Sequence, residues 1–211
     1  MLAGATGLTG GHLLKLLLAD PRYARVHALV RKPGLPAHPR LQEVVFDFDD
    51  PAKLPRVDDA FCCLGTTIKK AGSRAAFRKV DFDYVVGFAE QVKRAKGARF
   101  LVVSSLGADP NSKIFYTRVK GEMEAALRRI GFDELHIFQP SLLVGNRHES
   151  RVGERFGIAA SAIVTPLMLG PMRKYRPIDA ESVAVAMWKC AWMANPGIHV
   201  YTSDKIAAPA S

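Results

Sequence analysis

The stretch Gly4-Ala5-Thr6-Gly7-Leu8-Thr9-Gly10 places three glycines at intervals of three, close to the start of the chain. Three residues, Met1-Leu2-Ala3, precede it and read as the end of an apolar strand. Residues 12–18 follow it with the apolar stripe of a helix. A strand, a glycine turn and a helix in this order begin a parallel α/β sheet. Because such a strand normally has about five residues, we expect either an atypical first strand or a natural chain that starts further upstream.

The three glycines have separate physical roles in a loop of this kind. Gly4 permits the tight turn out of the strand, Gly7 lets the backbone approach a pyrophosphate, and Gly10 allows close packing of the helix on the strand. The helix offers unpaired N–H groups and the positive end of its dipole to phosphate oxygens. The stretch therefore predicts a dinucleotide site, and a tight turn without a ligand is the alternative.

The rest of the chain alternates between apolar runs and helical patterns. We predict strands at residues 26–30, 44–46, 60–64, 100–104 and 135–138. We predict helices at residues 75–94 and 115–130, the second ended by Gly131. Continuous apolar strands separated by helices indicate a parallel sheet that is covered on both faces. The predicted fold class is therefore α/β, a doubly wound parallel sheet in a single domain over residues 1–211.

Composition and charge exclude several classes of protein. The chain has 211 residues, of which 48% are hydrophobic, so it can bury a core. No apolar run approaches the roughly 18–20 residues that cross a bilayer, so we expect no membrane span. The formal net charge is +10. Because the basic residues are scattered rather than clustered, we expect a solvated basic surface and no nucleic-acid partner.

The cysteines are Cys62, Cys63 and Cys190. Neighbouring Cys62 and Cys63 would point to opposite faces of a strand, and a disulfide between them would be strained. No Cys/His pair has the spacing of a metal site, so we expect no bound metal. An odd number of cysteines without framework spacing, and no visible secretory signal, predict a cytoplasmic protein.

The end of the strand at residues 26–30 bears on which dinucleotide binds. A domain that prefers NAD usually has an acidic residue here, which bonds the ribose hydroxyls. This chain has Arg31 and Lys32 instead, and both would make charge-assisted bonds to a 2′-phosphate. We therefore predict NADP(H) as the cofactor, and an ordinary basic loop before Pro33 is the alternative.

A tyrosine and a lysine on one helix form the candidate catalytic pair. Tyr116 and Lys120 are four residues apart within the predicted helix 115–130, so they share one face. A nearby ammonium favours the phenolate form of a tyrosine, which then exchanges a proton with a carbonyl or alcohol. Ser104 and Ser105 follow the apolar strand before this helix, and Ser105 is our candidate to hold the substrate oxygen. The alternative is a surface tyrosine that packs on the aliphatic part of the lysine.

As a set, these residues resemble the short-chain dehydrogenase/reductase superfamily, in its extended or atypical form, which has an NAD(P)-binding Rossmann fold. Within it, the chain is similar to the branch of Tat-interacting-protein-like oxidoreductases and their small bacterial relatives. The further segments that carry the resemblance are Cys63-Leu64-Gly65-Thr66-Thr67, Val103-Ser104-Ser105-Leu106-Gly107-Ala108-Asp109, Tyr116-Thr117-Arg118-Val119-Lys120-Gly121-Glu122, and residues 140–147 and 149–154.

The resemblance implies a set of cofactor contacts and a small lid. The implied cofactor-binding residues, beyond the glycines and Arg31 and Lys32, are Thr6, Leu8, Thr9, Leu64, Gly65, Tyr116, Lys120, Leu143 and Arg151. Asp81 stands where many relatives have an asparagine that supports a proton relay, which leaves that relay open. Residues 141–177 would include a small C-terminal lid, and Asp179 would cap a helix at 180–194. Dimers are common in the superfamily, so a homodimer is also considered.

The predicted function is an NADP(H)-dependent reductase or dehydrogenase that acts on a small carbonyl or alcohol, and the sequence does not identify this substrate. Two alternatives stay open at this point. One is a non-catalytic NADP(H)-binding redox sensor or scaffold with a protein partner. The other is a sugar-type epimerase that uses the same Tyr116 and Lys120 pair, although the short C-terminal region argues against it.

Overall fold

The computed structural model of the chain describes residues 1–144 and 170–208. Within them, one sheet of seven strands has the order β3-β2-β1-β4-β5-β6-β9, and each neighbouring pair is parallel. The strands are β1 (Leu2–Ala3), β2 (Val26–Val30), β3 (Leu41–Val45), β4 (Asp59–Cys62), β5 (Arg99–Val103), β6 (Glu134–Gln139) and β9 (Gly197–Thr202). The chain builds outward from β1 in one direction and then in the other, which is the doubly wound order. The predicted fold class is confirmed.

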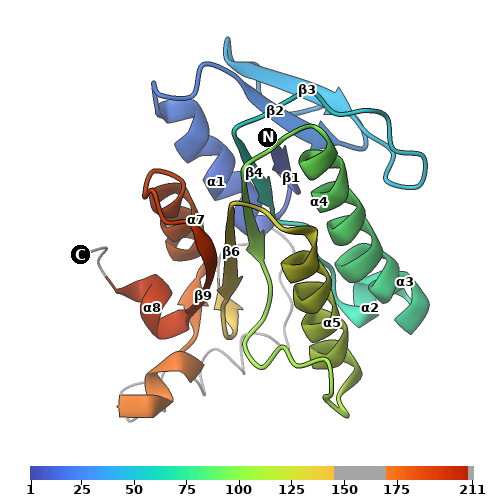
Figure 1. Ribbon diagram of the computed structural model, residues 1–211, viewed down its shortest axis with the longest axis vertical. Helices are drawn as coiled ribbons and strands as arrows, with labels where there is room; N and C mark the ends of the chain where they lie inside the picture. Colours follow the sequence, from blue (N-terminus) through green and yellow to red (C-terminus); the bar gives the residue numbers. More distant parts are fainter. Residues whose placement is uncertain (145–169, 209–211) are drawn as a thin grey trace.

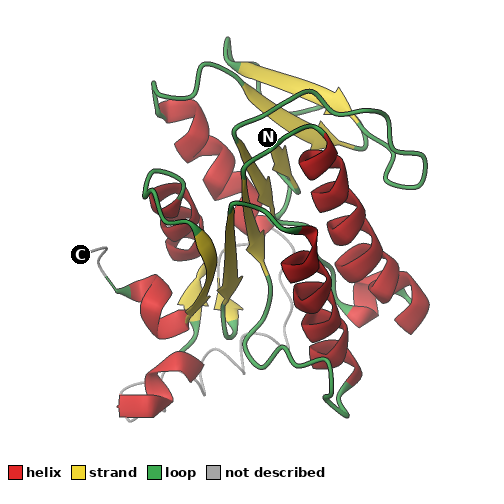
Figure 2. Ribbon diagram, in the orientation of Figure 1, coloured by secondary structure: helices red, strands yellow, loops and turns green. Residues whose placement is uncertain are grey.

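Two layers of helices cover this sheet. Figure 1 shows α1 (Leu8–Ala19) and α7 (Ala180–Cys190) on one side, and α4 (Tyr84–Arg94) and α5 (Phe115–Ile130) on the other. Figure 2 shows the same two helical layers in red around the strands. Leucines of α1 pack with α7 in one apolar cluster, and α4 packs with α5 in the other. Cys62 lies in the α4 and α5 cluster whereas Cys63 packs against the other, so they face opposite sides of the sheet.

Shorter elements connect these parts. Before α4 come α2 (Ile68–Ala71), α3 (Arg74–Arg78) and a single π-helical turn, η1 (Lys79–Asp83). A second, two-stranded sheet joins β7 (Leu143–Val144) to β8 (Ile178–Asp179), and the chain also forms η3 (Gly170–Tyr175) and α8 (Ser203–Ala207). None of the helices within residues 1–144 and 170–208 is long and apolar enough to cross a membrane.

The structure corrects several predicted boundaries. The helix predicted at 75–94 is divided into α3, η1 and α4, because a π turn interrupts it. β3 begins at Leu41 rather than at residue 44, β4 ends at Cys62 rather than at residue 64, and α1 already begins at Leu8. The helix at 115–130 is confirmed, and Gly131 ends it in the left-handed region at φ 76° and ψ 48°.

At the C-terminal side, two further predictions fail. α7 ends at Cys190 rather than at residue 194, and Asp179 precedes it without a side-chain capping bond within the described residues. β9 was not predicted at all. It is an edge strand that begins with exposed Gly197 and Ile198, so it lacks the continuous apolar pattern of a central strand.

The strand register brings the candidate site segments to one edge of the sheet. Ala3 pairs with Leu29 on one side and with Cys62 on the other, and Cys62 pairs with Val102. Because these strands are parallel, the segments that follow them leave the sheet at the same carboxyl edge. The glycine stretch, Arg31 and the residues after β4 and β5 therefore meet there.

Gly121 lets α5 pack against the loop that precedes it. A Cβ atom at Gly121 would lie 2.2 Å from the backbone carbon of Asp109 and 2.2 Å from the nitrogen of Pro110. Both distances are far inside van der Waals contact, so the loop and the helix fit only with glycine here. Gly87 in α4 is the opposite case, because its Cβ position has no neighbour within 4 Å.

We expect Gly121→Ala to lower the free energy of unfolding by about 1–3 kcal/mol, because the backbone must shift to admit the methyl group. Gly87→Ala is the matched control and should raise it by up to about 1 kcal/mol, since alanine has the higher helix propensity. Urea unfolding measures both changes. Equal stability of the two variants would contradict the close packing at Gly121.

Candidate functional site

The glycine turn between β1 and α1 is packed too closely for side chains. Gly4 has a φ of +85°, and a Cβ there would lie 2.6 Å from the carbonyl carbon and oxygen of Cys63. A Cβ at Gly10 would lie 2.0 Å from the carbonyl oxygen of Gly4. The backbone of the turn thus contacts both the segment after β4 and the first turn of α1.

The amino end of α1 presents backbone N–H groups at this turn. Gly7 is the N-cap residue and makes no side-chain capping bond. Its own N–H donates to the Gly4 carbonyl at 2.9 Å, and the N–H of Gly11 donates to the Gly7 carbonyl at 2.8 Å. The N–H groups of Leu8, Thr9 and Gly10 precede the first of the helical hydrogen bonds, so an anion can accept from them.

Arg31 and Lys32 lie beside this turn. They follow β2 directly, and β2 pairs with β1 through Leu29 and Ala3, so both basic residues come just past the level of Gly4. Both are exposed, and neither makes an ion pair within the described residues. Their charge is therefore available to a phosphate that reaches beyond the glycine turn.

Lys120 is the most deeply buried lysine of the described structure, with 4% of its surface exposed. Its Nζ lies 2.7 Å from Oδ1 of Asp81, a residue that is 1% exposed. A Cβ at Gly65 would lie 3.9 Å from the same Nζ, so the ammonium is beneath the segment that leaves β4. Burial alone would lower the pKa of Lys120, but the Asp81 carboxylate, together with Tyr116 and Cys62, outweighs it and raises that pKa above its ordinary value.

Tyr116 precedes Lys120 by one turn of α5 and is half-buried. Its ring packs on Phe77 of α3, with 5.4 Å between the ring centroids. Ser105 follows β5, and its hydroxyl donates only a long bond of 3.4 Å to the Leu106 carbonyl. The hydroxyl of Ser105 is thus weakly held and can turn to a substrate.

Glu124 is a site residue that the sequence did not point to. It lies one turn after Lys120 and is 5% exposed. Its carboxylate accepts from Ser104 Oγ at 2.5 Å and from Gln139 Nε2 at 2.9 and 3.0 Å. Burial raises the pKa of Glu124, although the bonds from Ser104 and Gln139 oppose this. The sequence could have indicated Glu124 through its spacing, because a residue four positions after Lys120 lies on the same buried face of α5.

The remaining predicted residues divide into three groups. Leu64 and Gly65 follow β4 and lie next to the glycine turn and Lys120, and their contact with the cofactor stays a prediction. Leu143 lies in the separate two-stranded sheet and packs on the α1 and α7 cluster, so its contact with the cofactor stays a prediction. Arg151 and most of the predicted lid lie outside the described residues.

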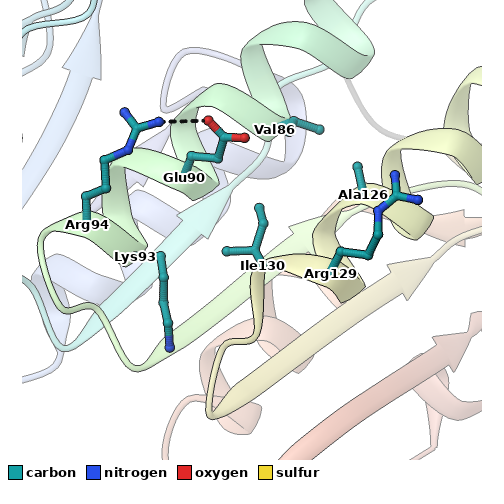
Figure 3. A pocket seen from close by; sticks show the side chains of 7 residues that line it. All are labelled: Val86, Glu90, Lys93, Arg94, Ala126, Arg129 and Ile130. Atoms are coloured by element: carbon teal, nitrogen blue, oxygen red, sulfur yellow. Dashed lines mark hydrogen bonds and ion pairs between the residues drawn. The ribbon is translucent and has the colours of Figure 1, made fainter.

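A groove of about 640 Å³ between the outer sides of α4 and α5 is separate from this site (Figure 3). The residues that line it are Val86, Glu90, Lys93, Arg94, Ala126, Arg129 and Ile130. Figure 3 shows the Arg94 side chain turned toward Glu90, to which it is bonded at 3.0 Å. None of the predicted site residues lines the groove, so its location does not bear on the chemistry at Tyr116 and Lys120.

Comparison with known proteins agrees with this arrangement. The profile of a family described as NAD(P)H-binding matches residues 4–156, which include the glycine turn, Asp81, Tyr116 and Lys120. The chain belongs to this NAD(P)H-binding family. The resemblance to atypical short-chain dehydrogenases/reductases is thereby confirmed at the level of the superfamily.

Two curated relatives show how far the similarity extends. The chain is 39% identical over 158 residues to Protein HTATIP2 of Rattus norvegicus, which covers 72% of this chain and 65% of the rat protein. It is 32% identical over 169 residues to Protein FMP52, mitochondrial, of Coccidioides immitis (strain RS), which covers 72% of this chain and 69% of the fungal protein. The match thus spans slightly less than two thirds of the rat protein.

Solved structures share the fold. MoeE5 in complex with UDP-glucuronic acid and NAD superposes with a TM-score of 0.71 at 18% identity, over 94% of this chain and 74% of MoeE5. The human epimerase family protein SDR39U1 with NADPH superposes with a TM-score of 0.62 at 19% identity, over 95% of this chain and 72% of that protein. One holds NAD and the other NADPH. Family and neighbours together support a nicotinamide cofactor for this chain.

The names of the fungal relatives contradict one prediction. The sequence led us to expect a cytoplasmic protein, but several fungal relatives are named as mitochondrial. The expected cytoplasmic location is contradicted by these relatives. A small, odd number of cysteines does not distinguish one reducing compartment from another.

We expect Gly10→Ala to weaken NAD(P)H binding by about tenfold or more, because its methyl group would displace the Gly4 carbonyl and open the turn that faces the phosphates. Gly11→Ala is the matched control, since its Cβ would make only an ordinary contact of 3.7 Å with the Ala5 carbonyl oxygen. Cofactor fluorescence titration measures both variants, and circular dichroism checks their folding. Equal affinities would exclude the tight turn as the determinant of binding.

Proposed function

We propose that the chain is an NADP(H)-dependent oxidoreductase that transfers hydride to or from a small carbonyl or alcohol, with Tyr116 as proton donor or acceptor. The observation that carries this proposal is the burial of Lys120, 4% exposed, one turn from Tyr116 and next to Gly65. Lysines are almost never buried unless they are paired. A charged lysine kept at the carboxyl edge of the sheet, beside a glycine turn, is typical of a functional site.

The residues at this edge suit a dinucleotide with a 2′-phosphate. The uncapped start of α1 offers backbone donors to a pyrophosphate, and the glycines leave no side chain in the way. Arg31 and Lys32 would take the 2′-phosphate, which a domain selective for NAD would repel with an acidic residue. Thr6 and Thr9 add hydroxyl donors within the same turn.

The chemistry then needs a proton as well as a hydride. NADPH, when bound, supplies the hydride that reduces a carbonyl carbon. Tyr116 would donate its phenolic proton to the carbonyl oxygen, while Ser105 holds that oxygen in place. The Lys120 ammonium would stabilise the phenolate that remains and bond the ribose. In the opposite direction the phenolate accepts the proton of an alcohol.

We expect Tyr116→Phe to lower kcat by about 100-fold or more and to leave NADPH affinity within about twofold, because the variant lacks only the acidic proton. Tyr23→Phe is the control and should behave as wild type, because that hydroxyl bonds Asp59 at the start of β4, at the opposite edge of the sheet. Steady-state rates with a panel of small aldehydes and ketones measure this. A wild-type protein that binds NADPH and reduces none of them would overturn hydride transfer and favour the redox sensor.

We expect the double variant Arg31→Ala/Lys32→Ala to lose about 10- to 100-fold in NADPH affinity and to change little toward NADH, because only NADPH has the 2′-phosphate. Lys53→Ala/Arg56→Ala removes the same charge from the exposed segment before β4, at the opposite edge of the sheet, and serves as the control. Fluorescence titration with both cofactors is the measurement. Equal loss of both cofactors in the test variant would exclude selection by these two residues.

A further inference from the structure

Asp81 is joined to the candidate site by both of its oxygens. Oδ1 lies 2.7 Å from Nζ of Lys120, and Oδ2 accepts from the backbone N–H of Thr66 at 2.9 Å. One buried carboxylate thus connects η1, the segment after β4 and α5. Thr66 directly follows Gly65, so the same carboxylate holds a stretch that borders the predicted cofactor.

The π turn explains how Asp81 reaches this position. Lys79, Asp81 and Asp83 all lie in η1, yet only Asp81 is buried. A π turn contains an extra residue compared with an α-helical turn, and such turns recur at functional sites. Here the π turn lies within the predicted helix 75–94, at the place where the Asp81 carboxylate is buried.

The groups that face Lys120 are few. They are Asp81 from η1, Tyr116 and Glu124 from α5, and Cys62 from β4. Among the described residues, only Asp81 bonds the Nζ directly. Without Asp81 the ammonium would be buried and unpaired, and burial would then lower the pKa of Lys120.

We propose that Asp81 is a positioning residue, which holds Lys120 in its charged form and aims its remaining N–H donors at the cofactor. The role of Lys120 in this inference rests on the proposed function. An ammonium has three N–H donors, and Asp81 occupies one of them. Asparagine is no substitute, because its amide has no charge to offset the ammonium, and its NH2 group would face one of the two donors that Oδ1 and Oδ2 now accept from.

The first test is the NADPH dissociation constant measured from pH 6.5 to pH 9.5. Wild-type affinity should be constant over this range, because the pKa of Lys120 is raised above it. In Asp81→Asn the lysine loses its proton within the range, so affinity should fall by roughly tenfold as the pH rises. Asp83→Asn, at an exposed aspartate of the same turn, should keep the wild-type profile. Lys120→Met should bind more weakly and show no such pH dependence.

The second test is thermal unfolding, which also covers a variant too unstable for titration. Asp81→Asn should lower Tm by on the order of 10 °C, because it leaves a buried charge unpaired. The double variant Asp81→Asn/Lys120→Met should recover most of that loss, since it removes the unpaired charge. A double variant no more stable than Asp81→Asn would overturn the proposal.

The two proposals fail in different ways. A wild-type protein that does not bind NADPH overturns the proposed function, and the unfolding comparison still tests the ion pair. A wild-type protein that binds NADPH, with an Asp81→Asn profile equally constant over pH, overturns only the role of Asp81.

Discussion

The carbonyl oxygen of Gly4 occupies the place where a side chain of residue 10 would begin, at 2.0 Å from the Cβ position. This close approach fixes α1 against the end of β1, an interior strand of the sheet between β2 and β4. Because the helix cannot move away, its first N–H groups are held at the carboxyl edge, where the segments after β2, β4 and β5 also emerge. That one contact between two backbone segments therefore sets where the first N–H groups of α1 lie.

α5 supplies the other half of the site as one rigid unit. Tyr116, Lys120 and Glu124 follow one another at intervals of one turn, so their relative positions are fixed by helix geometry. Gly121 sets the distance between this helix and the loop at Asp109 and Pro110. Glu124 bonds Ser104 and Gln139, which belong to the ends of two neighbouring strands. The helix is therefore packed on its preceding loop through Gly121 and joined to the sheet by buried hydrogen bonds.

The buried charges explain why this edge differs from the rest of the core. An unpaired ion in such surroundings is strongly unfavourable, so Lys120 requires Asp81, and Glu124 requires its two neutral donors and Arg128, 3.9 Å away. A core built for stability alone would use apolar residues here. Two carboxylates and an ammonium are nevertheless retained here, beneath the glycine-rich edge at which we propose that the cofactor binds.

The glycine spacing, the alternation of strands and helices, and the helix 115–130 were predictable, because each depends on residues close together in the chain. The pairing of Tyr116 with Lys120 follows from helix geometry for the same reason.

The inward turn of Asp81 was not predictable, since a π turn has no distinct hydrophobic period and interrupts a helix that otherwise looks continuous. In the sequence, Glu124 is indistinguishable from an ordinary helical glutamate, because its partners at the ends of β5 and β6 are distant in the chain. Edge strand β9 likewise forms because it pairs with β6, and its own residues do not show a strand pattern. Local patterns therefore determined the elements and the cofactor turn, and only tertiary packing decided which polar side chains are buried, because burial depends on neighbours that are distant in the chain.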